Sequence, residues 1–221
     1  MFNNYVVAID GPAASGKSTV ARKLAETLKI TYLSSGSVYR TITHICLSSK
    51  IPAENELIKN FLQNYVVTIT KGIVLVNNTD YSQYISLPET EKAVSSYSSL
   101  PCVREYAVGI LRNTAKNESI IMDGRDIGTV VFPNATHKFF LTASAEVRAK
   151  RRYDEFCKTH PNEKISLNTI LNEIIKRDQM DETRELSPLI KAEKAILIDN
   201  SKLNIEETIQ RIYNYICKAN Q

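Results

Sequence analysis

Residues 11–18 read GPAASGKS and match G-x-x-x-x-G-K-[ST], a pattern typical of loops that bind phosphate groups. Gly11 allows a tight turn, and Gly16 lets backbone N–H groups converge on phosphate oxygens at a helix N-terminus. Lys17 can reach the β- and γ-phosphates, and the Ser18 hydroxyl can bind Mg²⁺. This phosphate loop predicts a nucleoside triphosphate site. The predicted contacts come from Gly11, Pro12, Ala13, Ala14, Ser15, Gly16, Lys17, Ser18 and Thr19.

Two further glycine loops carry an arginine each. Five of the seven glycines lie in the phosphate loop, in SSGSVYR at 34–40 and in DGRDIGT at 123–129. Each loop follows a strand-like run, and ligands of open α/β sheets bind where the strands end. Arg40 and Arg125 are therefore predicted to face the phosphate loop.

Other charged residues repeat at helical spacing. Arg177, Asp181 and Arg184 share one helix face, as do Arg148, Arg151 and Arg152. A single arginine of this kind is more often a surface residue. The whole set suits a transfer between two polyanions, in which the donor, the acceptor and the moving phosphoryl group all need neutralisation.

The surrounding pattern alternates strands and helices. Short apolar runs lie at 5–10, 31–35, 119–123, 138–143 and 195–199, and helical patterns cover 101–117, 145–158, 166–180 and 204–219. Val20, Leu24 and Leu28 give helical periodicity directly after the phosphate loop. The pattern predicts an α/β fold with a central five-stranded parallel sheet and flanking helices.

Residues 65–85 depart from this alternation of strands and helices. They alternate β-branched and polar residues around two turn signals, Lys71-Gly72 and Asn77-Asn78. The stretch predicts a small antiparallel β insert that lies outside the core sheet. A further helix is expected from about Pro88.

Composition narrows the class of protein. The 221 residues suit one domain, and the net charge of +4 is too small to indicate binding to a nucleic-acid polymer. No apolar run approaches the roughly 20 residues of a membrane span, and no export signal is evident at the start. The four dispersed cysteines are expected to be reduced thiols in a cytoplasmic protein, and the three histidines lack metal-ligand spacing.

The ordered motifs resemble those of the bacterial cytidylate kinases, a family of phosphate-loop nucleoside-monophosphate kinases. The resemblance covers essentially the whole chain. Its two most specific motifs are DGRDIGTVVFP at 123–133 and RDQMDETRELSPL at 177–189. The matching stretches are IDGPAASGKST, SSGSVYR at 34–40, PCVRE at 101–105, DGRDIGTVVFP at 123–133 and KRDQMDETRELSPL at 176–189.

The resemblance implies a role for each matching residue. Ser35, Tyr39 and Arg40 match the loop that holds the acceptor nucleotide. Three further positions match those that read cytosine: Ser95, Arg104 and Asp126. Arg177 and Asp181 match residues beside the acceptor ribose. The residues that neutralise phosphates during transfer are then Lys17, Arg125, Arg148, Arg152 and Arg184, of which Arg148 and Arg152 belong to a mobile lid that closes over ATP.

The implied reaction moves the γ-phosphoryl group of Mg-ATP to CMP or dCMP. The implied parts are a core (1–35, 118–145, 190–221), a monophosphate-binding lobe with the β insert (36–117) and a helical lid (146–189). No membrane or nucleic-acid polymer is an expected partner, and the protein is expected to be a monomer. Two positions depart from the family: Ser34 replaces an aspartate, and Ser86 replaces an arginine. If the missing aspartate supports the metal or the loop in the family, Asp123 must supply more of that support here.

Two alternatives remain at the level of sequence. One is a related small kinase that acts on UMP, AMP or shikimate. The other is a phosphate-loop switch or an ATPase stimulated by nucleic acid, although the chain lacks both an N-K-x-D guanine signature and a dense basic stripe.

Overall fold

The protein folds as an α/β unit with two sheets. The computed structural model describes residues 5–116, 118–161 and 163–219. The strands are β1 (Val6–Asp10), β2 (Thr31–Ser34), β3 (Val67–Thr70), β4 (Ile73–Val76), β5 (Thr79–Asp80), β6 (Ile120–Gly124), β7 (His137–Thr142) and β8 (Ile196–Asp199). The helices are α1 (Lys17–Leu28), α2 (Ser35–Ser48), α3 (Asn55–Leu62), α4 (Pro88–Ser98), α5 (Pro101–Thr114), the π-helical turn η1 (Ile127–Val131), α6 (Ala145–Thr159), α7 (Leu167–Thr183) and α8 (Ile205–Ala219).

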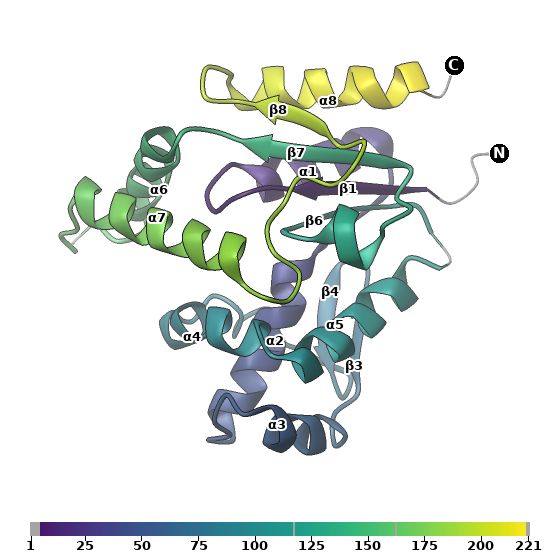
Figure 1. Cartoon of the computed structure of the whole chain (residues 1–221), viewed down its shortest axis with the longest axis vertical. Helices are drawn as coiled ribbons and strands as arrows, with labels where there is room; N and C mark the ends of the chain where they lie inside the picture. Colours follow the sequence, from purple (N-terminus) through teal and green to yellow (C-terminus); the bar gives the residue numbers. More distant parts are fainter. Residues whose placement is uncertain (1–4, 117, 162, 220–221) are drawn as a thin grey trace.

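The larger sheet has five parallel strands in the order β2-β6-β1-β7-β8. Parallel pairing brings the carboxyl ends of all five strands to one edge (Figure 1). Asp10 lies opposite Gly124 in the next strand, and Ser34 lies opposite Asp123. The loops that follow these residues are therefore neighbours in space, although they are far apart in the sequence.

Two hydrophobic layers cover the two faces of this sheet. On one face, Val7 and Ile9 of β1 pack with α1 and α8 through residues such as Leu24 and Ile212. On the other face, alternate residues such as Ala8 pack with α2, α3, α5 and the small sheet. In Figure 1 the helices and small sheet of residues 35–114 lie below the large sheet, and α8 lies above it.

The β insert forms a separate antiparallel sheet in the order β3-β4-β5. Its two turns have positive φ angles at both central residues, 49° and 80° at Lys71-Gly72 and 48° and 66° at Asn77-Asn78. Such turns favour glycine and asparagine and match the twist of a hairpin. A Cβ on Gly72 would lie 2.7 Å from the carbonyl oxygen of Tyr32, so this turn packs directly against β2.

Helices α6 and α7 pack together at the carboxyl edge of the large sheet (Figure 1). Their common apolar contacts come from Ala149, Ile170 and Ile174, which form a third small cluster. Ser144 and Ser166 cap the N-termini of the two helices by accepting N–H bonds, from Val147 at 3.3 Å and from Thr169 at 3.0 Å. We refer to these helices as the α6–α7 pair.

The structure confirms the predicted fold class. All five predicted core strands form, and the stretch around Lys71-Gly72 and Asn77-Asn78 forms the predicted antiparallel insert, although β5 contains only two residues. The four cysteines are free thiols. Within the described part of the chain, none of the helices combines the length and apolar character that a membrane span needs.

Glycine is required at position 11 by close packing between β1 and β7. Gly11 has a φ of +152°, and a Cβ there would lie 2.0 Å from the carbonyl oxygen of Leu141. We expect Gly11→Ala to lower the free energy of unfolding by at least about 2 kcal/mol, because the backbone must move to relieve the overlap. Urea denaturation followed by circular dichroism measures this loss.

Gly109→Ala is the matched control for this substitution. Gly109 lies on the exposed side of α5, where an added Cβ meets nothing within 4 Å. We expect this change to raise the free energy of unfolding by about 0.5–1 kcal/mol, since alanine favours a helix interior more than glycine does. Equal effects of the two substitutions would contradict the argument.

Candidate active site

A cleft of about 700 Å³ opens at the carboxyl edge of the large sheet. It gathers residues from both ends of the chain and from the lobe between them. Most of the residues predicted from the sequence line it: Ala13, Ala14, Ser15, Gly16, Lys17, Ser18, Thr19, Ser35, Tyr39, Arg40, Ser95, Arg104, Arg125, Asp126, Arg152, Arg177, Asp181 and Arg184. Gly11, Pro12 and Arg148 are not among the described lining residues.

The phosphate loop forms one end of this cleft. Gly16 has a φ of 88° and directly precedes α1, so the N–H groups of the first helical turn point at the cleft. Lys17 is buried, and its ammonium donates to the carbonyl oxygen of Pro12 at 2.6 Å. Burial, with Arg125 nearby, holds the pKa of Lys17 well below its usual value, against the opposite effect of Asp123 and Asp10. An anion in the cleft would stabilise the charged form of this side chain.

Two side-chain oxygens beside the phosphate loop are suitable ligands for a magnesium ion. The Ser18 hydroxyl donates to Oδ2 of Asp123 at 2.7 Å, and both residues line the cleft. Hydroxyl and carboxylate oxygens suit Mg²⁺, which keeps several waters and usually takes only one or two protein ligands beside substrate phosphates. The described residues contain no cluster of three or more histidine, cysteine or acidic side chains suited to a metal ion. This pair therefore fits an ion that is shared with a nucleotide.

Tyr32 holds the other oxygen of the same carboxylate. Its hydroxyl donates to Oδ1 of Asp123 at 2.7 Å. Burial and the Asp123 charge raise the pKa of Tyr32 well above its usual value, so the phenol stays a donor at neutral pH. Ser34 lies opposite Asp123 in the sheet and also lines the cleft. Asp123 is thus the one carboxylate that β2 and β6 present beside the loop.

The far end of the cleft contains a buried ion pair between Arg104 and Asp126, whose side chains are 7% and 3% exposed. Arg104 also donates to the hydroxyl of Ser187 at 3.0 Å and to the carbonyl oxygen of Ser98 at 3.1 Å. Its guanidinium lies 5.3 Å from the ring centroid of Tyr39. The pair is rigid and desolvated, so it can recognise a planar polar group by its hydrogen-bond pattern.

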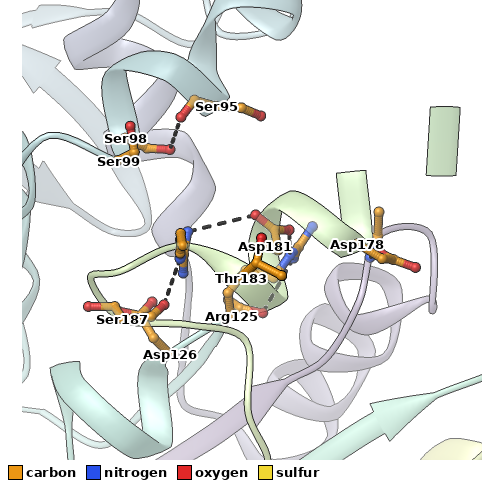
Figure 2. Close-up of polar contacts among 12 residues, drawn as sticks. Ser95, Ser98, Ser99, Arg125, Asp126, Asp178, Asp181, Thr183 and Ser187 are labelled. Atoms are coloured by element: carbon orange, nitrogen blue, oxygen red, sulfur yellow. Dashed lines mark hydrogen bonds and ion pairs between the residues drawn. The ribbon is translucent and has the colours of Figure 1, made fainter. Parts of the chain in front are cut away.

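A group of arginines lies between the two ends. Arg125 donates to Oδ2 of Asp181 at 2.8 Å, and Arg184 lies 3.7 Å from the other carboxylate oxygen of the same residue. Figure 2 shows Arg125 beside Asp181, and it shows Asp126 close to Ser187. Nε of Arg177 and Nη2 of Arg184 are buried without a hydrogen-bond partner among the described residues. Buried N–H donors of this kind are suited to an anionic ligand.

Burial lowers the pKa of the guanidinium of Arg40, Arg177 and Arg184. For Arg177, the neighbouring charges of Arg125, Arg152 and Arg40 act in the same direction. The site therefore concentrates positive charge in a partly desolvated space, which favours binding of phosphate groups.

The two arginines predicted to close over ATP are placed differently. Arg152 lines the cleft and lies 3.7 Å from Glu91 of α4, in an exposed ion pair that spans its mouth. Arg148 instead turns behind the phosphate loop, where it pairs with Asp178 at 2.5 Å. In this conformation Arg148 is not among the described residues that line the cleft, and its contact with the ATP phosphates stays a prediction.

Sequence reasoning grouped Arg151 with the other arginines but missed its partner Asn200 and the residues beyond it at the donor end. Arg151 donates to the side-chain and backbone oxygens of Asn200 at 3.0 and 2.8 Å, and Asn200 donates to the carbonyl oxygen of Ser15 at 3.0 Å. The cleft continues past them along Leu203, Asn204, Ile205 and Glu206. The sequence offered one signal for Asn200, its position directly after the last strand. Each of the three glycine loops also directly follows a strand.

Asp10 supports the cleft from beneath. Its two carboxylate oxygens accept the N–H groups of Ile127 and Gly128 at 2.8 and 2.7 Å. Burial raises the pKa of Asp10 to about 6, although these two bonds act in the opposite direction.

The chain is similar to known proteins along almost its whole length. A model of the cytidylate kinase family matches residues 7–218. A cytidylate kinase of Carboxydothermus hydrogenoformans is 42% identical over 219 residues, which cover 97% of this chain and 98% of that protein. A cytidylate kinase of Geobacillus sp. is 43% identical over 222 residues and 98% of each chain.

Solved structures with low identity support the fold alone. A shikimate kinase from Bacteroides thetaiotaomicron gives a TM-score of 0.50 at 13% identity and covers 96% of this chain and 98% of its own. An uncharacterised protein from Eubacterium ventriosum gives a TM-score of 0.53 at 16% identity, with 97% and 99% covered.

The raised pKa of Asp10 predicts a pH dependence of stability. Between about pH 4 and 6 the folded protein keeps a proton on Asp10 that the unfolded chain releases, so the free energy of unfolding decreases as pH rises through this window. We expect Asp10→Asn to remove a slope of up to about 1.4 kcal/mol per pH unit. Urea denaturation of both proteins at pH 4.5, 5.5 and 6.5 tests this, and parallel pH curves would contradict it.

Proposed function

The chain belongs to the cytidylate kinase family, and we propose that its cleft transfers the γ-phosphoryl group of ATP to CMP or dCMP. The products are ADP and CDP or dCDP. The protein is a nucleoside-monophosphate kinase. The observation that carries the proposal is the buried Arg104–Asp126 pair, which lines the same cleft as the phosphate loop.

Cytosine matches the chemistry of this pair. Its N4 amino group can donate to Asp126, and its O2 and N3 atoms can accept from Arg104. Within the described residues only Oδ2 of Asp126 is engaged, so Oδ1 is available to accept this bond. Uracil has a carbonyl oxygen in place of the amino group, and the carboxylate would repel it. Ser95 also lines the cleft and contributes a further hydroxyl.

The acceptor phosphate is assigned to the arginines between the two ends. Arg40, Arg125 and Arg184 would bind it, while Arg177 and Asp181 would lie beside the ribose. Ser35 and Tyr39 support this wall: Ser35 donates to the carbonyl oxygen of Asp123 at 2.9 Å, and burial raises the pKa of Tyr39 to about 12.

The transfer itself needs no protein nucleophile. An oxygen of the acceptor phosphate attacks the γ-phosphorus, and the bond from that phosphorus to the β–γ bridging oxygen breaks. Lys17, Arg125, Arg152 and Arg184 would neutralise the charge of the moving group. Ser18 and Asp123 would hold Mg²⁺, which neutralises phosphate charge when it is bound.

We also propose roles for two parts of the chain, the lid and the acceptor lobe. Residues 146–189 act as the lid and 36–117 as the acceptor lobe, and closure would exclude water that otherwise hydrolyses ATP. The exposed pair of Arg152 and Glu91 already joins these two parts across the cleft. The enzyme is proposed to act as a monomer in the cytoplasm.

A substrate panel tests the reaction directly. In a coupled assay of ADP release with Mg-ATP, we expect kcat/KM for CMP and dCMP to exceed that for UMP and AMP at least about tenfold. UMP or AMP turnover faster than that of CMP would refute the cytosine assignment. Turnover that ignores CMP and requires DNA or RNA would instead support a nucleic-acid-stimulated ATPase.

Asp126→Ala tests the placement of the base. We expect kcat/KM for CMP to fall about 100-fold, because the amino group and Arg104 both lose their partner. The preference for CMP over UMP should disappear while ATP affinity stays within twofold. Asp126→Asn keeps the side-chain volume and should also lose the preference. Asp80→Ala, at an exposed carboxylate of the insert, is the control. Intact CMP selectivity in both Asp126 variants would contradict the assignment.

A further inference from the structure

Both backbone polar groups of Ala13, in the phosphate loop, are bound by the α6–α7 pair. The N–H group of Ala13 donates to Oδ1 of Asp178 on α7 at 3.2 Å. The carbonyl oxygen of Ala13 accepts from Nη1 of Arg148 on α6 at 3.1 Å. Two helices that follow the loop by more than 130 residues in sequence therefore fix the orientation of one of its peptide units.

Arg148 and Asp178 also bind one another. Nη1 of Arg148 lies 2.5 Å from Oδ2 of Asp178, and the two side chains are only 7% and 12% exposed. Nε of Arg148 donates to the carbonyl oxygen of Ala143, just after β7, at 2.9 Å. The guanidinium is thus tied at once to the loop, to α7 and to the end of the sheet. A buried pair with this many hydrogen bonds is held in a defined geometry.

The next residue of the loop adds an apolar contact. Ala14 has a φ of 55°, a left-handed conformation that is unfavourable for a residue with a β-carbon. Ala14 packs against the small cluster of Ala149, Ile170 and Ile174 in the α6–α7 pair. The unfavourable conformation is therefore held by packing on the same helices that bind Ala13.

Asp178 also links the helix that carries two acceptor residues to the phosphate loop. It lies on α7 between Arg177 and Asp181, which both line the cleft. Figure 2 shows Asp178 and Asp181 on the same helix, with Arg125 beside Asp181. A helix is rigid over one turn, so the bond from Asp178 to Ala13 fixes the distance from these acceptor residues to the phosphate loop.

We propose that Arg148 and Asp178 are positioning residues that lock the phosphate loop in its binding conformation and hold α7 in register with it. Neither side chain is among the described residues that line the cleft, so both act through the Ala13 peptide and not on a substrate. The proposal rests on the proposed function, because it concerns the separation of donor and acceptor nucleotides. It assigns to Arg148 a role other than contact with ATP.

Asp178→Asn is the sharpest test, because it keeps the shape of the side chain. Its amide oxygen can still accept from Ala13, but its NH₂ group then faces the guanidinium of Arg148 and breaks the pair. We expect the Kd for ADP, measured by isothermal titration calorimetry, to rise about tenfold and kcat to fall at least about tenfold. The Kd for CMP should change less than about threefold, since the acceptor residues stay on an intact helix.

Arg148→Lys is the second variant, and it decides the question if Asp178→Asn does not fold. Lysine keeps the charge, but one ammonium group cannot replace the fork that reaches Ala13, Ala143 and Asp178 together. We expect the same direction of change in ADP affinity and kcat. Lys150→Met is the matched control on α6, because it removes an exposed ion pair with Asp154.

The readouts separate positioning from simple stability. Circular dichroism and thermal unfolding establish that each variant is folded at the assay temperature. Folded variants of Asp178 and Arg148 that keep the ADP affinity and kcat of the wild type would overturn the proposal, even with a lower Tm. If the wild-type enzyme did not phosphorylate CMP or dCMP, the proposed function would fail, and the ADP titrations would still decide whether the pair shapes the loop.

Discussion

Asp10 accepts the backbone N–H groups of Ile127 and Gly128, and this buried carboxylate connects the two halves of the cleft. Directly after Asp10, the chain enters the phosphate loop at Gly11. The turn that Asp10 binds, η1, directly follows Asp126, the residue assigned to the acceptor base. One carboxylate at the end of a central strand thus fixes where the donor and acceptor sites lie relative to each other. Its two bonds satisfy N–H groups that would otherwise be orphaned in the interior.

The charged residues in and next to the cleft form two classes with different tasks. Asp126 and Asp178 are each paired to one arginine in a buried, specific geometry, and these pairs define shape. The guanidinium groups of Arg177 and Arg184 each have a buried N–H donor that lacks a partner among the described residues. These donors are suited to bind an anion. A site built only of the first class would be stable but would not attract phosphates. A site built only of the second would be hard to fold, because like charges would face each other in a desolvated space.

Sequence patterns predicted most of the fold and most of the cleft, because both depend on local rules. Apolar runs and loops after strands are visible in one dimension, and parallel pairing then brings Arg40, Arg125 and the phosphate loop to one edge. The orientation of a side chain on a helix depends on what packs against it. For this reason Arg148 and Arg152, one turn apart, were given the same role and yet occupy different surroundings. Asn200 was missed because a single asparagine after a strand carries no distinctive pattern.

The turn at Lys71-Gly72 shows how a surface hairpin can share the sequence constraints of an active site. Hairpin tips usually tolerate insertions and tags. Here the tip touches the backbone of Tyr32, and the hydroxyl of that same residue holds Asp123 beside the phosphate loop. A bulky residue at position 72 would therefore push on the strand that orients the carboxylate. A fluorophore belongs on another surface of the molecule, such as the outer face of α5 at Gly109, where an added Cβ meets nothing within 4 Å.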